Sequence, residues 1–120
     1  MKFAMVFPGQ GSQSVGMLRA YAGLPGIDGI LAEAEEVLGR EFVALLDKGP
    51  AEQLNLTVNT QPAMVTAGFA VFRAWRSLGG PLPTVVAGHS LGEYTALVAA
   101  GGLSFRDCLP LVRLDRKSVV

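Results

Sequence analysis

The chain has little of the chemistry on which many functions depend. Its 120 residues contain one cysteine, one histidine and one tryptophan, and 10 basic side chains balance 10 acidic ones. A lone cysteine, Cys108, excludes an intrachain disulfide and a multi-cysteine metal site, and it fits a reducing cytosol. We expect Cys108 to lie on a helix and to pack in the hydrophobic core of the domain. The lack of net charge and of like-charge blocks argues against nucleic acid as a partner.

Long hydrophobic runs are also missing. The first apolar run, Phe3–Phe7, ends at Pro8-Gly9 and is too short for the core of a signal peptide. No run approaches the roughly 18 apolar residues that span a bilayer. We therefore expect a soluble cytoplasmic protein with no membrane partner. At 50% hydrophobic residues the chain can form the core of one small domain, and no linker or repeat divides residues 1–120.

The order of the predicted elements indicates an α/β fold with a parallel sheet flanked by helices. Phe3–Phe7 and Thr84–Ala87 are typical of parallel strands buried on both faces. Helices are expected from an Asp28 cap to Gly39, at Phe42–Leu46, at Ala51–Leu54, from a Thr60 cap to about Leu78, at Glu93–Ala100 and after Ser104. The helix after Thr60 is apolar around most of its circumference and should be largely buried. Two strands make an incomplete sheet.

The most informative motif is Gly88-His89-Ser90-Leu91-Gly92, between a predicted strand and a predicted helix. This Gly-x-Ser-x-Gly pattern in that setting is typical of a nucleophile elbow. Gly88 and Gly92 lack side chains, so strand and helix can approach closely around a strained Ser90. The helix N-terminus presents N–H groups to a developing oxyanion. Ser90 is therefore the candidate nucleophile, and the alternative is an ordinary turn with Ser90 as the helix N-cap.

A serine nucleophile needs a general base, and the chain offers one histidine. His89 directly precedes Ser90, and successive side chains at the end of a strand point to opposite faces. We therefore expect its imidazole to point away from the Ser90 hydroxyl. His89 is predicted to be a structural residue under the turn, and no general base is assigned within the chain.

A second glycine-rich motif, Pro8-Gly9-Gln10-Gly11-Ser12-Gln13, follows the first strand. It has no Lys-Ser/Thr pair and no Gly-x-Gly-x-x-Gly completion, which argues against a phosphate-binding loop. Loops after adjacent parallel strands meet at the carboxyl edge of the sheet. The Gln10 backbone N–H is thus expected to form an oxyanion hole with the Leu91 N–H. The alternative is a glycine turn without a role.

Four segments together resemble the malonyl-CoA:acyl carrier protein transacylases. They occur in the order and at the approximate spacing of that family: Phe7–Gln13, Gly49–Glu52, Thr60–Ala63 and Gly88–Tyr94. The resemblance extends from Met1 to about Leu114 and corresponds to the N-terminal part of a longer pattern. It implies an α/β-hydrolase-like catalytic domain whose ferredoxin-like subdomain and C-terminal part are absent from residues 1–120.

The resemblance also implies a reaction. Ser90 would take a malonyl group from malonyl-CoA as an ester and pass it to the phosphopantetheine thiol of acyl carrier protein, a step of fatty acid synthesis. It places the oxyanion N–H groups at Gln10 and Leu91, with no metal or other cofactor. The family's base histidine lies beyond residue 120, so we expect negligible activity from the isolated chain.

The family also holds the malonyl carboxylate with an arginine fork on the helix after the elbow. Ungapped alignment from Ser104 places that position at Asp115, with Arg116 one residue late and about 100° around the helix. Arg116 is the candidate carboxylate ligand. The resemblance ends at Asp115–Val120, which predicts a truncation, a frameshift or a foreign tail. Two other functions stay open: a non-catalytic remnant or interaction fragment, and a serine esterase of another family.

Overall fold

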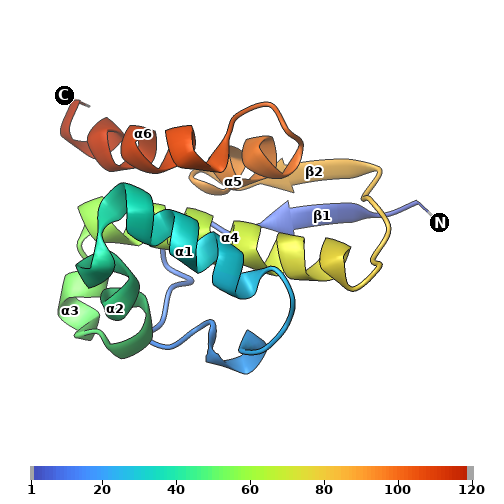
Figure 1. Ribbon diagram of the computed structural model, residues 1–120. Helices are drawn as coiled ribbons and strands as arrows, with labels where there is room; N and C mark the ends of the chain where they lie inside the picture. The colour runs from blue at the N-terminus through green and yellow to red at the C-terminus, as the bar shows by residue number, and fades with distance from the viewer. Residues whose placement is uncertain (1, 119–120) are drawn as a thin grey trace.

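Two parallel strands and a group of helices make up the fold, as the α/β prediction requires (Figure 1). The computed structural model describes residues 2–118, with side chains through Arg113. The elements are β1 (Ala4–Phe7), a 3-10 turn (Arg19–Tyr21), α1 (Ile27–Leu38), α2 (Arg40–Lys48), α3 (Ala51–Leu54), α4 (Thr57–Ser77), β2 (Val85–Gly88), α5 (Gly92–Ala99) and α6 (Phe105–Ser118). Within this part of the chain, no helix is both long and apolar enough to cross a membrane.

The sheet has one covered face and one open face. β1 and β2 pair in parallel with Phe7 opposite Gly88, so their carboxyl ends lie at the same edge. Side chains alternate along a strand, and Phe7 is buried against the helices whereas Val6 is 67% exposed. Val85 on β2 is 56% exposed. The prediction that both strands are buried on both faces is therefore wrong for the described residues, because their helices cover one face only.

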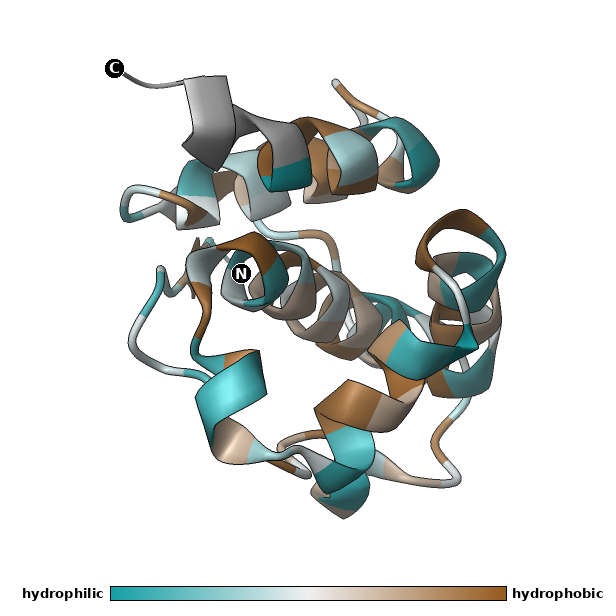
Figure 2. Cartoon of the chain, turned by 90° about the vertical axis from the view of Figure 1, so that its left-hand side faces the viewer, coloured by the Kyte–Doolittle hydropathy of each residue, from teal (hydrophilic) through white to brown (hydrophobic). Residues whose placement is uncertain are grey.

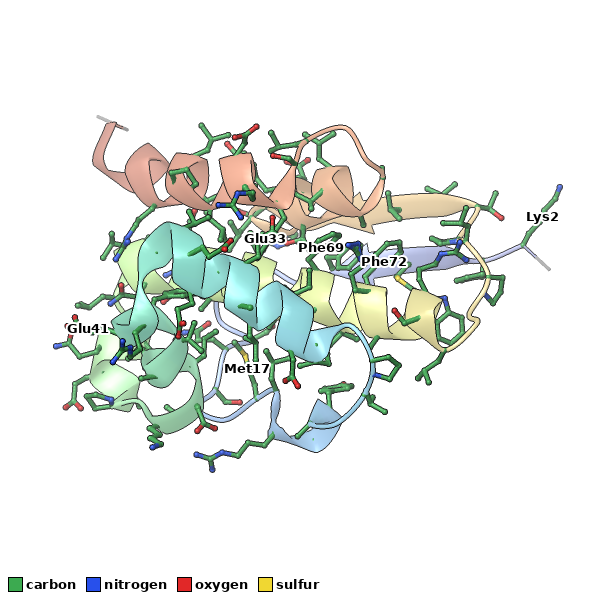
Figure 3. All side chains as sticks on the ribbon, in the orientation of Figure 1. Lys2, Met17, Glu33, Glu41, Phe69 and Phe72 are labelled. Carbon is green, nitrogen blue, oxygen red and sulfur yellow. The ribbon has the colours of Figure 1, made fainter. Side chains whose placement is uncertain are left out.

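α4 is the central helix of the core, as its nearly continuous apolar surface predicts. Phe69 and Phe72, labelled in Figure 3, project from it with ring centroids 6.3 Å apart. Phe72 meets Phe7 of β1 edge to face at 6.5 Å, and Phe69 meets Phe105 of α6 at 5.3 Å. Figure 2 shows hydrophobic and hydrophilic residues alternating around the surrounding helices. The aromatic contacts thus join the sheet, α4 and α6.

α4 begins earlier than predicted. Its N-cap is Leu56, in an extended conformation, and the Leu56 carbonyl accepts hydrogen bonds from the N–H groups of Asn59 and Thr60, both at 2.8 Å. The predicted cap, Thr60, lies inside the helix with Pro62 two residues later. Its hydroxyl instead donates to the carbonyls of Leu54 and Leu56, which ties the end of α3 to α4. The cap prediction failed because a backbone carbonyl already starts the helix.

α1 also begins without the predicted side-chain cap. Gly26 is the N-cap, with φ of 94°, and Asp28 lies in the first turn instead of before it. A Cβ on Gly26 would lie 3.2 Å from the backbone carbonyl carbon of Arg73 in α4. A glycine therefore permits both the left-handed turn and the close approach of α4. The predicted end of α1 is confirmed, since Gly39 is its C-cap.

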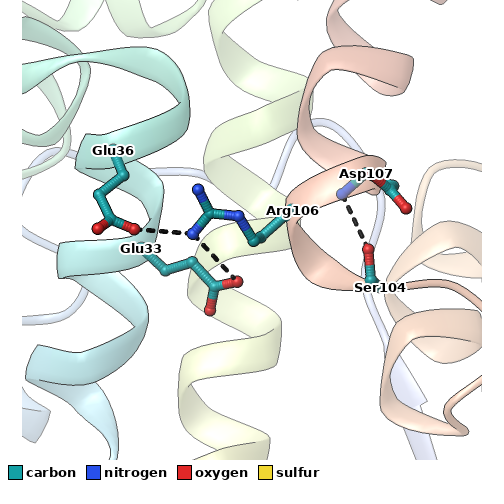
Figure 4. Close-up of polar contacts among 5 residues, drawn as sticks. All are labelled: Glu33, Glu36, Ser104, Arg106 and Asp107. Atoms are coloured by element: carbon teal, nitrogen blue, oxygen red, sulfur yellow. Dashed lines mark hydrogen bonds and ion pairs between the residues drawn. The ribbon is translucent and has the colours of Figure 1, made fainter.

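Polar contacts orient α6 relative to α1 (Figure 4). The Ser104 hydroxyl accepts a 3.1 Å hydrogen bond from the Asp107 N–H, so the helix start predicted at Ser104 is confirmed. Arg106 on the first turn reaches Glu36 at 2.7 Å and Glu33 at 3.8 Å on α1. Exposed ion pairs contribute little to stability, so these pairs orient α6 more than they hold it. The apolar contacts of Phe105 supply the larger share.

Two buried threonines differ in whether their hydroxyl groups have a hydrogen-bond partner. Thr60 and Thr95 are both buried on helices, but the Thr95 hydroxyl has no hydrogen-bond partner among the described residues. A buried unpaired hydroxyl is destabilising, and valine has nearly the same shape and helix propensity as threonine. We expect Thr95→Val to raise the free energy of unfolding by about 1 kcal/mol and Thr60→Val to lower it by about 1–2 kcal/mol. Urea denaturation measures both, and changes of the same sign would contradict the assignment.

Burial controls the chemistry of Cys108 on α6. The side chain is fully buried, and desolvation raises the pKa of its thiol to about 11. The folded state thus binds the proton more tightly than the unfolded state, whose thiol has a pKa near 8.5. We expect stability to fall as the pH rises from about 9 to 11, and less so in Cys108→Ala. A thiol reagent at pH 8 should label Cys108 only after unfolding in urea; fast labelling of the folded chain would contradict this burial.

Candidate functional site

The turn between β2 and α5 places Ser90 in an unusual conformation. Among the described residues, Ser90 is the one non-glycine residue with positive φ, at 55°. That region is unfavourable for residues with a Cβ, and strain of this kind is common at functional sites. Ser90 is exposed, whereas Leu91 behind it is 3% exposed and packs into the core. The turn therefore presents the serine hydroxyl at the surface on a firmly packed base.

Two glycines make this turn possible, as the sequence pattern predicted. A Cβ on Gly88 would lie 1.9 Å from the carbonyl carbon of Gly92, and a Cβ on Gly92 would lie 2.1 Å from the carbonyl oxygen of Phe7. Both distances are well inside van der Waals contact with backbone atoms that cannot rotate away. The start of α5 therefore lies directly against the ends of both strands.

Ser90 does not act as the cap of α5. The N-cap is Leu91, already in the right-handed helical region, and no side chain caps it. The N–H groups of Gly92, Glu93 and Tyr94 donate to the carbonyls three residues earlier, in a tight first turn. The alternative of an ordinary turn capped by the Ser90 side chain is therefore wrong. Within the described chain, the Leu91 N–H has no backbone acceptor.

The loop after β1 lies beside the Ser90 turn. A Cβ on Gly9 would lie 2.7 Å from the carbonyl oxygen of His89, so the two loops are in backbone contact. This contact follows from the parallel pairing of Phe7 with Gly88, which brings both loops to one edge of the sheet. Gln10 is the next residue along that loop and is exposed. The arrangement brings Gln10, Leu91 and Ser90 to the same edge, as predicted.

Side-chain hydrogen bonds hold this loop to the turn before α4. The Gln10 side-chain amide donates to the Thr57 hydroxyl at 3.1 Å, and that of Gln13 donates to the Asn55 side-chain oxygen at 2.9 Å. The Gly11 N–H donates to the other end of the Gln13 amide at 2.7 Å. Asn55 and Thr57 were not among the site residues predicted from the sequence. Their position just before the Thr60–Ala63 motif was the available signal.

His89 takes part through its backbone. Its N–H donates to the Phe7 carbonyl at 3.3 Å, and its carbonyl accepts from the Gly92 N–H at 2.9 Å. Its Nδ1 lies 3.7 Å from the Cβ position of Gly9, so the ring lies toward the loop after β1. No hydrogen bond joins His89 to Ser90 in the portion that the structure describes. These contacts agree with a structural residue.

The predicted carboxylate ligand lies outside the described side chains. α6 extends to Ser118, but the side chains of Asp115 and Arg116 are beyond the described part. Their register relative to Ser90 therefore stays a prediction. The other candidate residues, Ser90, Gln10 and Leu91, all lie at the carboxyl edge of the sheet.

Comparison with known sequences identifies related proteins. The family model described as the acyl transferase domain matches residues 4–120, so the match continues past Leu114. Malonyl CoA-acyl carrier protein transacylase of Salmonella typhimurium is 52% identical over 117 residues, which are 97% of this chain and 38% of the relative. The protein of the same name from Bacillus subtilis is 47% identical over 113 residues, 93% of this chain and 35% of that relative. The chain thus spans under two fifths of these relatives.

Solved structures show the same fold. The acyl-carrier-protein S-malonyltransferase of Burkholderia pseudomallei superimposes with a TM-score of 0.94 at 60% identity, over 98% of this chain and 38% of that one. A malonyl-transacylase in complex with a type II polyketide synthase acyl-carrier protein gives 0.92 at 50% identity, over 98% and 38%. The α/β arrangement of the described residues is therefore that of the corresponding segment in both structures.

Proposed function

Because this chain belongs to the acyl transferase domain family, we propose that residues 1–120 form the nucleophile-bearing portion of a malonyl-CoA:acyl carrier protein transacylase. The observation that carries the proposal is the left-handed Ser90 between Gly88 and Gly92 at the turn from strand to helix. This geometry supports a nucleophile elbow in an α/β-hydrolase-like domain. The substrates proposed are malonyl-CoA and acyl carrier protein, which relatives of this identity are named for.

In the proposed reaction, the Ser90 oxygen attacks the thioester carbonyl carbon of malonyl-CoA. The carbonyl π electrons move to oxygen, and the N–H groups of Gln10 and Leu91 donate to that oxyanion. When the oxyanion collapses, the C–S bond breaks and the coenzyme A thiolate leaves, taking the proton that Ser90 lost. The phosphopantetheine thiol of acyl carrier protein then attacks the seryl ester by the reverse sequence. Both half-reactions use the same two donors.

The proton transfer needs a base that these residues do not place beside Ser90. The contacts of His89 go to Phe7, Gly9 and Gly92, so we assign it a structural role and place the base outside residues 1–120. Loss of the base from a serine nucleophile lowers the rate by several orders of magnitude. This chain therefore supplies the nucleophile and its geometry, and Arg116 is its candidate ligand for the malonyl carboxylate. Acting alone, the chain should transfer malonyl groups slowly.

A hybrid protein tests this division of labour. Residues 1–120 replace the matching segment of the Burkholderia pseudomallei relative, to which they are 60% identical. We expect the hybrid to transfer radiolabelled malonyl groups from coenzyme A to acyl carrier protein, and the chain alone to do so at least about a thousandfold more slowly. The Ser90→Ala hybrid is the matched control and should be inactive. A folded but inactive hybrid, or a fully active chain alone, would contradict the proposal.

A further inference from the structure

We propose that Asn55, in the turn between α3 and α4, and Thr57, the first residue of α4, are positioning residues that hold the Gln10 backbone N–H beside Ser90. The inference rests on the proposed function, because it assigns these side chains a role in forming the oxyanion hole. It goes beyond the resemblance, in which neither residue has a part. Both lie about 45 residues away from Gln10 in the sequence, so the contact exists only in the folded chain.

The loop has few means of holding its own shape. Gln10, Gly11 and Ser12 are exposed, and no atom lies within 4 Å of the Cβ position of Gly11, whose φ is 115°. Its packed contact is at Gly9, against the backbone of His89. A glycine-containing exposed loop samples many conformations unless other groups restrain it. The direction of the Gln10 N–H therefore depends on what holds residues 10–13.

The restraint comes from two side chains, Asn55 in the α3–α4 turn and Thr57 at the start of α4. Thr57 accepts from the Gln10 amide at 3.1 Å, and Asn55 accepts from the Gln13 amide at 2.9 Å. Gln13 also accepts from the Gly11 N–H at 2.7 Å, so it connects the loop backbone directly to Asn55. Together the two glutamines form a bridge on both sides of Gly11. These bonds hold the Gln10 side chain and the peptide unit that follows Gln10.

The turn that carries these acceptors is itself rigid. The buried Thr60 hydroxyl donates to the carbonyls of Leu54 and Leu56, and the Asn59 side-chain amide donates to the Gln53 carbonyl at 2.9 Å. Thr60 opens the Thr60–Ala63 motif, so the structure gives that motif a use that its sequence does not reveal. It locks the turn from which Asn55 and Thr57 reach the loop.

Positioning of a donor has large kinetic effects. Removal of one oxyanion donor lowers rates by about 10²–10³, and misplacement by about 1 Å can cost about 10². Loss of one of two anchors leaves the loop partly restrained. We therefore expect Thr57→Val to lower the rate of reaction at Ser90 about tenfold, because it removes the acceptor hydroxyl and keeps the shape of the side chain.

The test uses the hybrid protein, in which the Burkholderia pseudomallei relative supplies the residues beyond this segment, and an alkyl fluorophosphonate. The Ser90 oxygen bonds to phosphorus, the P–F bond breaks and fluoride leaves, and the serine proton passes to the base outside residues 1–120. The negative charge that develops on the phosphoryl oxygen needs the same donors. We expect Thr57→Val to lower the rate of Ser90 labelling about tenfold and Thr57→Ser to restore it. Asn55→Ala and Asn55→Asp form a second pair with the same expectation. Thr84→Val, at an exposed threonine distant from this loop in the sequence, should label at the unaltered rate.

Amide hydrogen exchange gives an independent readout of the loop. In Asn55→Ala the Gly11 N–H, which donates to the Gln13 side chain, should exchange at least about fivefold faster, with an unchanged melting temperature. Equal labelling rates in the Thr57→Val hybrid and the unaltered hybrid, or unchanged exchange at Gly11 in Asn55→Ala, would overturn the positioning role. An unaltered hybrid that folds and does not label at Ser90 would instead contradict the proposed function, and with it the premise of this inference.

Discussion

Gly92→Ala is expected to lower the free energy of unfolding by about 3 kcal/mol or more. The new Cβ would lie 2.1 Å from the Phe7 carbonyl oxygen and 3.1 Å from the Pro8 carbonyl oxygen. Both atoms belong to the backbone at the end of β1, so no side-chain rotation relieves the overlap. α5 would have to separate from the sheet, which would also displace Leu91 from the core. Thermal and urea denaturation measure the change.

Gly29→Ala is the matched control for this substitution. Gly29 is exposed on α1, and nothing lies within 4 Å of its Cβ position. Alanine is favoured over glycine inside a helix by about 1 kcal/mol, so the same chemical change should stabilise the chain there. Opposite signs at the two sites would show that close approach, and not glycine itself, determines the effect. A Gly92→Ala chain within about 0.5 kcal/mol of the unaltered chain would contradict the described turn.

Ser90 substitutions should separate strain from chemistry. Ser90→Ala keeps the Cβ in the left-handed region, so we expect unchanged stability and complete loss of acyl labelling. Ser90→Gly removes the Cβ that makes φ of 55° unfavourable, so the chain should gain about 1 kcal/mol while it also loses labelling. A gain of stability in Ser90→Gly alone identifies strain that the fold holds at its candidate nucleophile.

Stability and labelling are measured on the same preparations of two proteins. One is the hybrid, in which residues 1–120 replace the matching segment of the Burkholderia pseudomallei relative, and the other is the 120-residue chain. Ser104→Ala serves as the control for a serine that is a helix cap and not a nucleophile. It should lower stability by about 1 kcal/mol, since the Asp107 N–H loses its acceptor, and it should retain labelling. Retained labelling in Ser90→Ala would exclude Ser90 as the acyl acceptor.

The local features of the site were predictable from the sequence. Gly88 and Gly92 at fixed spacing around Ser90 encode a close approach of strand and helix, and the structure contains that approach. Parallel strands place their following loops at one edge, which correctly predicted that Gln10 lies near the turn. These inferences succeeded because each depends on a few neighbouring residues or on the sheet topology.

Other features depend on contacts between distant segments and were missed. Asn55 and Thr57 bind a loop that precedes them by more than 40 residues, and no local pattern specifies that pairing. The start of α4 was misplaced because Leu56 caps it through a backbone carbonyl, which any residue possesses. The open face of the sheet at Val6 was missed because an apolar strand has the same sequence whether one face or both are covered.

The residue that carries the acyl group decides whether Ser90 is the nucleophile. The hybrid protein is incubated with malonyl-CoA in the absence of acyl carrier protein, quenched in acid and digested, and its peptides are analysed by mass spectrometry. We expect a malonyl ester on Ser90 that is absent from the Ser90→Ala hybrid. Its malonyl group should pass to acyl carrier protein when that protein is added. A malonyl group on any other residue, or transfer to acyl carrier protein by the folded Ser90→Ala hybrid, would contradict it.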